Sequence, residues 1–260
     1  YTYYTGNSRG FHCYPRSSLM RHMLPGDNLG LLVSSQLATK GFQHIFCTDR
    51  IIESSAVSNK TKEITSVLPL YLYPEDEPRR PNLSPEYLAE LSAKIAFDPA
   101  PEQVFHYIYG LFHSPTYRIR FAEFLKMDFP RVLMPPDGEL FKALGLLGEQ
   151  LVGYHLMERK GPDFIKYPVA GENMVTGVRY SVQDQRVWIN KKQYFEPAPP
   201  KVWEFHIGGY QVCKKWLSDR KGRELSYDDI QHYGQVVSAL SETIRLMGEI
   251  DTLTVKAFGW

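Results

Sequence analysis

The sequence has few cysteines, and their number and spacing exclude two common kinds of site. Only Cys13, Cys47 and Cys213 occur in 260 residues, and no CxxC pair is present. An odd number without that spacing argues against a disulfide framework and against a structural zinc site. We therefore expect a protein of the reducing cytoplasm that holds no metal.

Motifs for nucleotide binding and for hydrolysis are also missing. The chain contains no GxGxxG and no GxxxxGK[ST] loop, and Gly208 and Gly209 form its only Gly-Gly pair. A phosphate cradle therefore has no support. No HExxH or GxSxG sequence is present either, so a zinc peptidase and a serine hydrolase lack their central residues. The chain itself is expected to be non-catalytic and to bind no cofactor.

Long apolar runs are absent as well. No segment of about 20 apolar residues and no charged-then-apolar leader occurs, so neither membrane spanning nor secretion is supported. The chain begins at Tyr1 without a preceding Met, which fits a piece of a longer protein. With 43% apolar residues it can form one large core or two modest ones, and we expect two lobes.

Charge is distributed unevenly along the chain, although the net charge is only +1. Residues 186–223 hold nine Lys and Arg against three acids, whereas residues 224–260 hold six acids against two basic residues. The first of these segments, called the basic block below, also carries aromatic and amide side chains. Such a composition predicts a polyanion partner.

The residue patterns predict an α+β fold with β-sheet lobes, a helical bundle-like lobe and a long C-terminal helix. Residues 1–75 are β-rich, with strands expected at 29–33, 43–48 and 64–73. Residues 76–101 are expected to be a linker or excursion, because six prolines between positions 74 and 101 should prevent a regular element.

Helices are expected next, over residues 102–160, and a β segment with the basic block over 161–225. Apolar spacing places three helices at 102–113, 117–126 and 138–158. Alternation then predicts a hairpin within 174–190 that turns at residues 183–185. In residues 226–260, a capping-box-like start at Ser226 and a seam of apolar residues with period 3.5 predict a helix that packs against one long partner helix.

Several stretches resemble one known family. The basic block reads INKKQYF followed by VWEFHIGGYQVCKKWLSDRKGR, and the N-terminal region contains YTYYTGNSRGFHCYPRSSLMRHML, SNKTKEITSVLPLYLYP and LFHSPTYRIRFAEFLKMDFPR. These stretches resemble the C-terminal specificity region of type ISP single-polypeptide restriction-modification enzymes, over nearly the whole chain. The resemblance implies target recognition on duplex DNA. It also implies an upstream adenine-N6 methyltransferase domain in the same polypeptide, with S-adenosylmethionine as its cofactor.

An adenine methyltransferase carries an Asn/Asp-Pro-Pro-Tyr/Phe element that holds the flipped base, and this chain has none. We therefore expect binding rather than catalysis here. Cations and tyrosines suit phosphate contacts and stacking, and an amide suits an adenine edge. The expected DNA-binding residues are Arg9, Arg16, Lys60, Lys62, Lys191, Lys192, Gln193, Tyr194, Tyr210, Lys214, Lys215, Arg220, Lys221 and Arg223. Base readout in the loops at 60–62 or 183–186 is a further possibility.

Two other interpretations remain open from the sequence. One is a protein-interaction module that docks a partner through the apolar seam of the C-terminal helix. The other is a nuclease, because Pro136 and Asp137 followed by Glu158 and Lys160 spell the PD…ExK pattern. The residues between them predict one amphipathic helix rather than adjacent strands, so we expect the nuclease match to be fortuitous. Trp188, Trp203, Phe205 and Trp216 are expected to be core residues.

Overall fold

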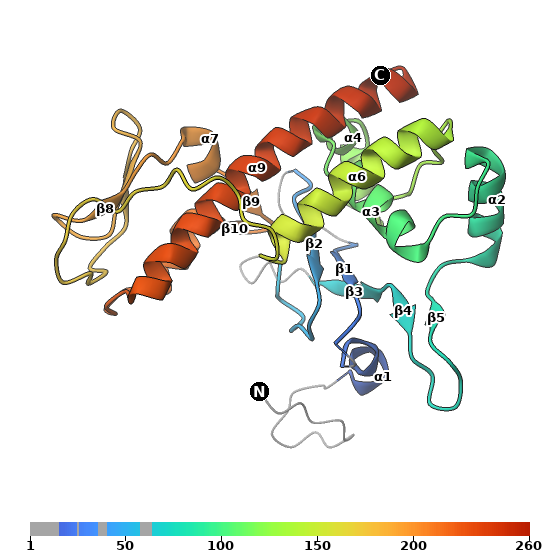
Figure 1. Ribbon diagram of the computed structural model, residues 1–260, viewed down its shortest axis with the longest axis horizontal. Coiled ribbons are helices and arrows are strands. Elements are labelled where there is room, and N and C mark those ends of the chain that lie inside the picture. Colours follow the sequence, from blue (N-terminus) through green and yellow to red (C-terminus); the bar gives the residue numbers. More distant parts are fainter. Residues whose placement is uncertain (1–15, 25, 36–40, 58–63) are drawn as a thin grey trace.

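The elements of the chain are arranged along one long C-terminal helix, α9 (Tyr227–Phe258), in a computed structural model (Figure 1). The structure describes residues 16–24, 26–35, 41–57 and 64–260. A small sheet of strands β6 to β8 lies at one end, most of the helices lie at the other, and the N-terminal sheet lies between them (Figure 1). The α+β class and the long C-terminal helix are confirmed.

The N-terminal sheet has three antiparallel strands in the order β2-β1-β3. Its strands and the short helices before it are α1 (Ser17–Met20), η1 (Arg21–Met23), β1 (Gly30–Val33), β2 (Ile45–Thr48) and β3 (Ser66–Pro69). The central strand β1 is buried on both faces: Leu31 and Val33 face the helical core, whereas Leu32 packs with Val67 of β3 in a small separate cluster. The predicted third strand is split, because β3 is followed by β4 (Tyr71–Leu72).

The prediction that no regular element persists between residues 74 and 101 is wrong. A short strand, β5 (Arg80–Pro81), pairs with β4, and α2 (Pro85–Ile95) follows it. Pro85 occupies the first turn of α2, where no backbone N–H is needed, and the Ser84 side chain accepts a hydrogen bond from the Tyr87 N–H. A proline in that position starts a helix instead of breaking one.

Helices α3 (Pro101–Phe112) and α6 (Gly138–His155) form the centre of the helical core. They approach closely where glycines face each other: a Cβ built on Gly148 would lie 1.9 Å from the His106 carbonyl oxygen. The helix predicted at 117–126 is instead two short ones, α4 (Pro115–Arg120) and α5 (Ala122–Leu125), separated at Phe121.

The C-terminal β segment forms a second lobe with its own core. It contains β6 (Arg179–Ser181), β7 (Arg186–Trp188), β8 (Tyr194–Phe195), α7 (Pro200–Trp203), β9 (His206–Ile207), β10 (Tyr210–Gln211) and α8 (Val212–Ser218). The predicted hairpin is confirmed, because β6 and β7 pair antiparallel with Tyr180 opposite Val187. Val187, Phe195 and Leu217 are buried together against Tyr233 of α9.

Helix α9 completes both cores. The predicted capping box is present, because the Ser226 side chain accepts from the Asp229 N–H and the Asp229 side chain accepts from the Ser226 N–H. The seam residues Tyr233, Val237 and Leu240 belong to the second core, whereas Leu246 and Ile250, on another face of the helix, belong to the helical core. The prediction of one long partner helix is wrong, since the seam packs against α7, α8 and the β6–β8 lobe and another face of α9 packs against α6. The first half of the seam is thus packed against other parts of the same chain. The docking interpretation requires an exposed seam and therefore loses its basis.

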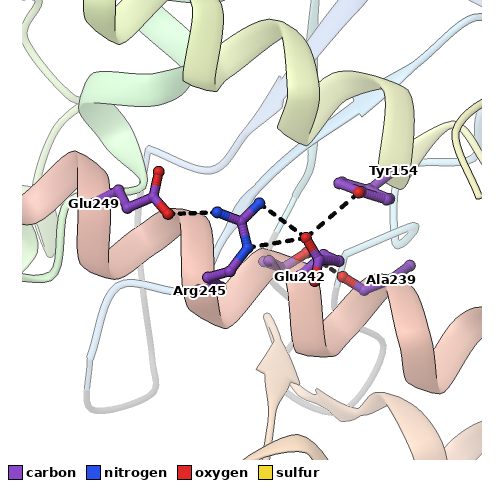
Figure 2. Close-up of polar contacts among 6 residues, drawn as sticks. Tyr154, Ala239, Glu242, Arg245 and Glu249 are labelled. Atoms are coloured by element: carbon purple, nitrogen blue, oxygen red, sulfur yellow. Dashed lines mark hydrogen bonds and ion pairs between the residues drawn. The ribbon is translucent and has the colours of Figure 1, made fainter. Parts of the chain in front are cut away.

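Polar contacts fix α9 against its neighbours. Figure 2 shows Tyr154 of α6 and Arg245 of α9 pointing toward Glu242, with O···O and N···O distances of 3.4 and 2.8 Å. Arg245 also pairs with Glu249. Asp251 of α9 accepts hydrogen bonds from the backbone and hydroxyl of Thr116, at 2.7 and 2.8 Å, and so holds the first turn of α4.

Candidate nucleic-acid interface

Two basic turns lie side by side because one extended segment, residues 173–177, is bonded to both. Lys191 and Lys192 are exposed in the turn between β7 and β8, and Lys221 and Arg223 are exposed in the turn after α8. The N–H of Val175 donates to the Arg223 carbonyl at 3.0 Å, and the Gly222 N–H donates back to Val175 at 2.8 Å. On the other side, the Thr176 N–H donates to the Ile189 carbonyl at 2.9 Å. The backbones of two exposed basic turns that are about 30 residues apart in sequence are thus held close together.

The turn that presents Lys191 and Lys192 is built by two amide side chains. Asn190 Oδ1 accepts from the N–H groups of Lys192 and Gln193, at 2.9 and 2.7 Å. Gln193 is only 3% exposed, and its Oε1 accepts from the Asn173 N–H at 2.9 Å while its Nε2 donates to the Val169 carbonyl at 3.1 Å. The assignment of Gln193 to base readout is therefore corrected: its amide is fully used in holding the turn.

Helix α8 contributes a second cluster of aromatic and basic side chains. Tyr210, Lys215, Trp216 and Arg220 line a hollow of about 390 Å³ with an apolar floor. The Arg220 guanidinium carbon lies 3.4 Å from the centre of a Trp216 ring, and its Nη1 donates to the Trp216 carbonyl at 3.0 Å. Trp216 was expected to be buried, but it is half-buried and forms a wall of this hollow. Trp216 of the helix and Arg220 of the turn after it thus form one stacked pair.

Several cations of the α8 region are already paired within the chain. Lys215 pairs with Asp219, and its Nζ lies 5.4 Å from the centre of the Tyr210 ring. Arg220 Nε lies 3.4 Å from Asp229 Oδ1. By contrast, Lys214 is exposed. Among the residues that the structure describes, the cations of the basic block that are exposed and unpaired are Lys191, Lys192, Lys201, Lys214, Lys221 and Arg223.

The structure does not bring all predicted residues to this surface. Arg16 is exposed, but it directly precedes α1, which lies well away from the β6–β8 sheet in Figure 1. Arg9, Lys60 and Lys62 lie outside the described residues.

Two arginines lie next to Tyr194 and Trp188: Arg186, which belongs to the loop at 183–186 considered for base readout, and Arg179, which sequence reasoning missed. The guanidinium carbon of Arg179 is 5.0 Å from the Trp188 ring centre, and that of Arg186 is 4.4 Å from the Tyr194 ring centre. The two rings are themselves 4.5 Å apart. Trp188 is half-buried rather than a full core residue. The alternation in the hairpin could have identified Arg179. Val178 and Tyr180 lie on one face of the strand, so Arg179 between them lies on the opposite face.

The PD…ExK pattern does not form a site. Asp137 caps the first turn of α6 by accepting from the Leu140 N–H at 2.8 Å, and Glu158 follows the end of the same helix. Because an α-helix rises about 1.5 Å per residue, this 18-residue helix separates the two acids by roughly 27 Å. Within the described part of the chain, no group of three or more His, Cys, Asp and Glu side chains could hold a metal ion.

The two described cysteines have no nucleophilic character. Cys47 and Cys213 are free and buried, and burial raises the pKa of each thiol to about 12. A thiol with so high a pKa stays protonated at neutral pH. Among the described helices, none combines the length and apolar character that crossing a bilayer requires.

Comparison with known proteins gives one family and one fold. The model of the type ISP C-terminal specificity domain matches residues 1–249. Similar solved structures are a DrdV–DNA complex (21% identity, TM-score 0.68), the type ISP restriction-modification enzyme LlaBIII bound to DNA (19%, 0.65) and a nuclease-deletion mutant of the type ISP enzyme LlaGI with a DNA substrate mimic (18%, 0.61). The similarity covers 86, 87 and 86% of this chain but only 25, 16 and 17% of theirs, respectively. No curated protein matches the chain.

Proposed function

Because the chain belongs to the type ISP C-terminal specificity domain family, we propose that it recognises a duplex DNA target for a restriction-modification polypeptide. The pair of basic turns tied together by residues 173–177 carries this proposal. Exposed cations on a rigid frame suit a DNA backbone, because each releases a condensed counterion and the set fixes the orientation of the protein on the duplex. The three similar solved structures are all complexes with DNA or a DNA mimic, which supports the same partner.

We further propose that the parent polypeptide methylates adenine at N6 through a methyltransferase domain upstream of this chain, with S-adenosylmethionine as the methyl donor. The chain spans a quarter or less of the similar solved proteins, so most of their length lies in other domains. In the cytoplasm, this chain would orient the duplex so that its target adenine faces that domain. Mapping N6-methyladenine in DNA from cells that express the parent, with and without this region, tests whether this region selects the target that the upstream domain methylates.

Salt dependence of duplex binding tests the role of the cations. If the four exposed cations of the two basic turns each contact a phosphate, the logarithm of the association constant should fall with a slope of roughly −3.5 against the logarithm of salt concentration. From 50 to 200 mM salt, the affinity for duplex DNA should then fall by roughly 10²-fold. Affinity that stays constant over this range, or no binding to a duplex at all, would contradict DNA recognition by this chain.

A further inference from the structure

The outer face of the β6–β8 sheet carries a row of aromatic and basic side chains. Pairing places Arg179 opposite Trp188 and Trp188 opposite Tyr194, so these three share one face. The next positions along the strands, Val187 and Phe195, point the other way into the core. The sheet therefore turns an apolar face inward and a guanidinium with two rings outward.

Arg179 and Arg186 both lie over rings of this row, but only Arg179 is free. The Arg186 Nε donates to Glu196 Oε2 at 2.7 Å, which neutralises its charge and raises its pKa. Arg179 is exposed, and no carboxylate within the described part of the chain pairs with it. A guanidinium held over a ring loses little further freedom on binding, so its donors are oriented in advance.

Arg179 also shares a hollow with one of the basic turns. Together with Gly177, Trp188, Asn190 and Lys191 it lines an open depression of about 420 Å³. Gly177 is exposed, and a side chain added there would meet nothing within 4 Å. An oriented guanidinium, an exposed ammonium and open space beside a strand edge are thus adjacent.

We propose that Arg179 reads a guanine in the major groove while Lys191 and Lys192 contact the flanking phosphates. This assignment rests on the proposed function. The planar fork of an arginine donates two hydrogen bonds to guanine O6 and N7, whereas an ammonium is a point charge suited to a phosphate. The major groove, about 12 Å wide, admits a two-stranded β-ribbon such as the β6–β7 hairpin.

Selection of bound duplexes from a random-sequence pool tests the assignment. The wild-type chain and Arg179→Lys are each used to select duplexes, and the enriched sequences are compared. We expect the wild type to enrich a consensus and the variant to lose a roughly tenfold preference for G·C at one position, with the other positions retained. Arg79→Lys is the matched control, because Arg79 is also exposed and lies 4.5 Å over a ring, that of Tyr71, in a different sheet.

The possible outcomes separate the two proposals. If the wild type and Arg179→Lys enrich the same consensus, Arg179 does not read a base, although the proposed function stands. If Arg179→Lys binds every duplex more weakly by the same factor, Arg179 contacts a phosphate. That result would also overturn base readout. If the wild type enriches no sequence, target recognition by this chain fails, and the role of Arg179 fails with it. Thermal unfolding of each variant confirms that the exposed substitutions leave the fold intact.

Discussion

At the scale of single residues, Gln193 shows that an amide in a basic loop can serve the loop itself. The sequence places it between lysines and a tyrosine, where an adenine contact is a reasonable expectation. The structure gives its side chain four hydrogen-bond partners within its own lobe, including the Asn173 N–H. Those partners lie up to 24 residues away along the chain, so no local pattern could reveal them.

Replacing Gln193 with Ala should lower the free energy of unfolding by roughly 1–3 kcal/mol. The substitution removes the amide of the buried Gln193 and leaves the Asn173 N–H and the Val169 carbonyl, both of half-buried residues, without that partner, and shielded polar groups carry a desolvation penalty of that size. Urea denaturation measures the change, with the exposed Lys192→Ala as the control. A stable Gln193→Ala protein that loses affinity for its target alone would restore the base-reading role.

Replacing Lys191 and Lys192 with Ala should act on affinity without affecting the fold. Both side chains are exposed, and each is expected to neutralise one phosphate. The slope of log affinity against log salt should therefore decrease in magnitude by about two units, equally for target and random duplexes. The exposed pair Lys94 and Lys256, on α2 and α9, provides a control of equal charge change. An effect confined to the target duplex would contradict the phosphate role.

At the scale of elements, the sequence predicts those whose signals are local. Helices α3 and α6 and the β6–β7 hairpin follow from apolar spacing, and the start of α9 follows from its capping residues. Helix α2 was missed because a proline-rich composition was given more weight than the Ser84 and Pro85 start signal. The partners of α9 were missed because the period of a seam says nothing about which element covers it.

Leu240→Ala should destabilise the protein by roughly 2–5 kcal/mol. Leu240 is 4% exposed and lies where α9 packs on the second core, so truncation removes buried contacts and leaves a cavity. Chemical denaturation measures the loss, and Tyr227→Ala is the control, since Tyr227 is on the same helix but 74% exposed. A change below about 0.5 kcal/mol would mean that the seam is not packed as described.

At the scale of the whole molecule, buried histidines make the fold sensitive to acid. Burial lowers the pKa of His22, His106, His113 and His155, and that of His155 falls to about 3. The unfolded chain takes up protons at these positions below about pH 6.5, whereas the folded chain takes them up only at lower pH. These histidines therefore do not reduce the free energy of unfolding above about pH 6.5, but they reduce it increasingly as the pH falls below that value.

His155 alone should reduce the free energy of unfolding by about 1 kcal/mol between pH 6 and pH 5, because its pKa is about 3 in the folded chain. His155→Gln should remove this contribution, whereas the exposed His232→Gln serves as the control. Urea denaturation at a series of pH values gives the slopes. Equal slopes for the wild type and His155→Gln would show that His155 accepts its proton in the folded state as readily as in the unfolded state.

The position of α9 in both cores also limits how a new DNA preference could be transplanted into this chain. A graft that stops at residue 225 would bring a foreign β6–β8 lobe onto the resident Tyr233 and Leu240, which pack against side chains of the original lobe. A graft that includes all of α9 would instead disturb Leu246 and Ile250 in the helical core. The natural junction for such a chimera therefore lies inside the helix, between residues 240 and 246, with the donor supplying everything from the start of the β lobe to that point.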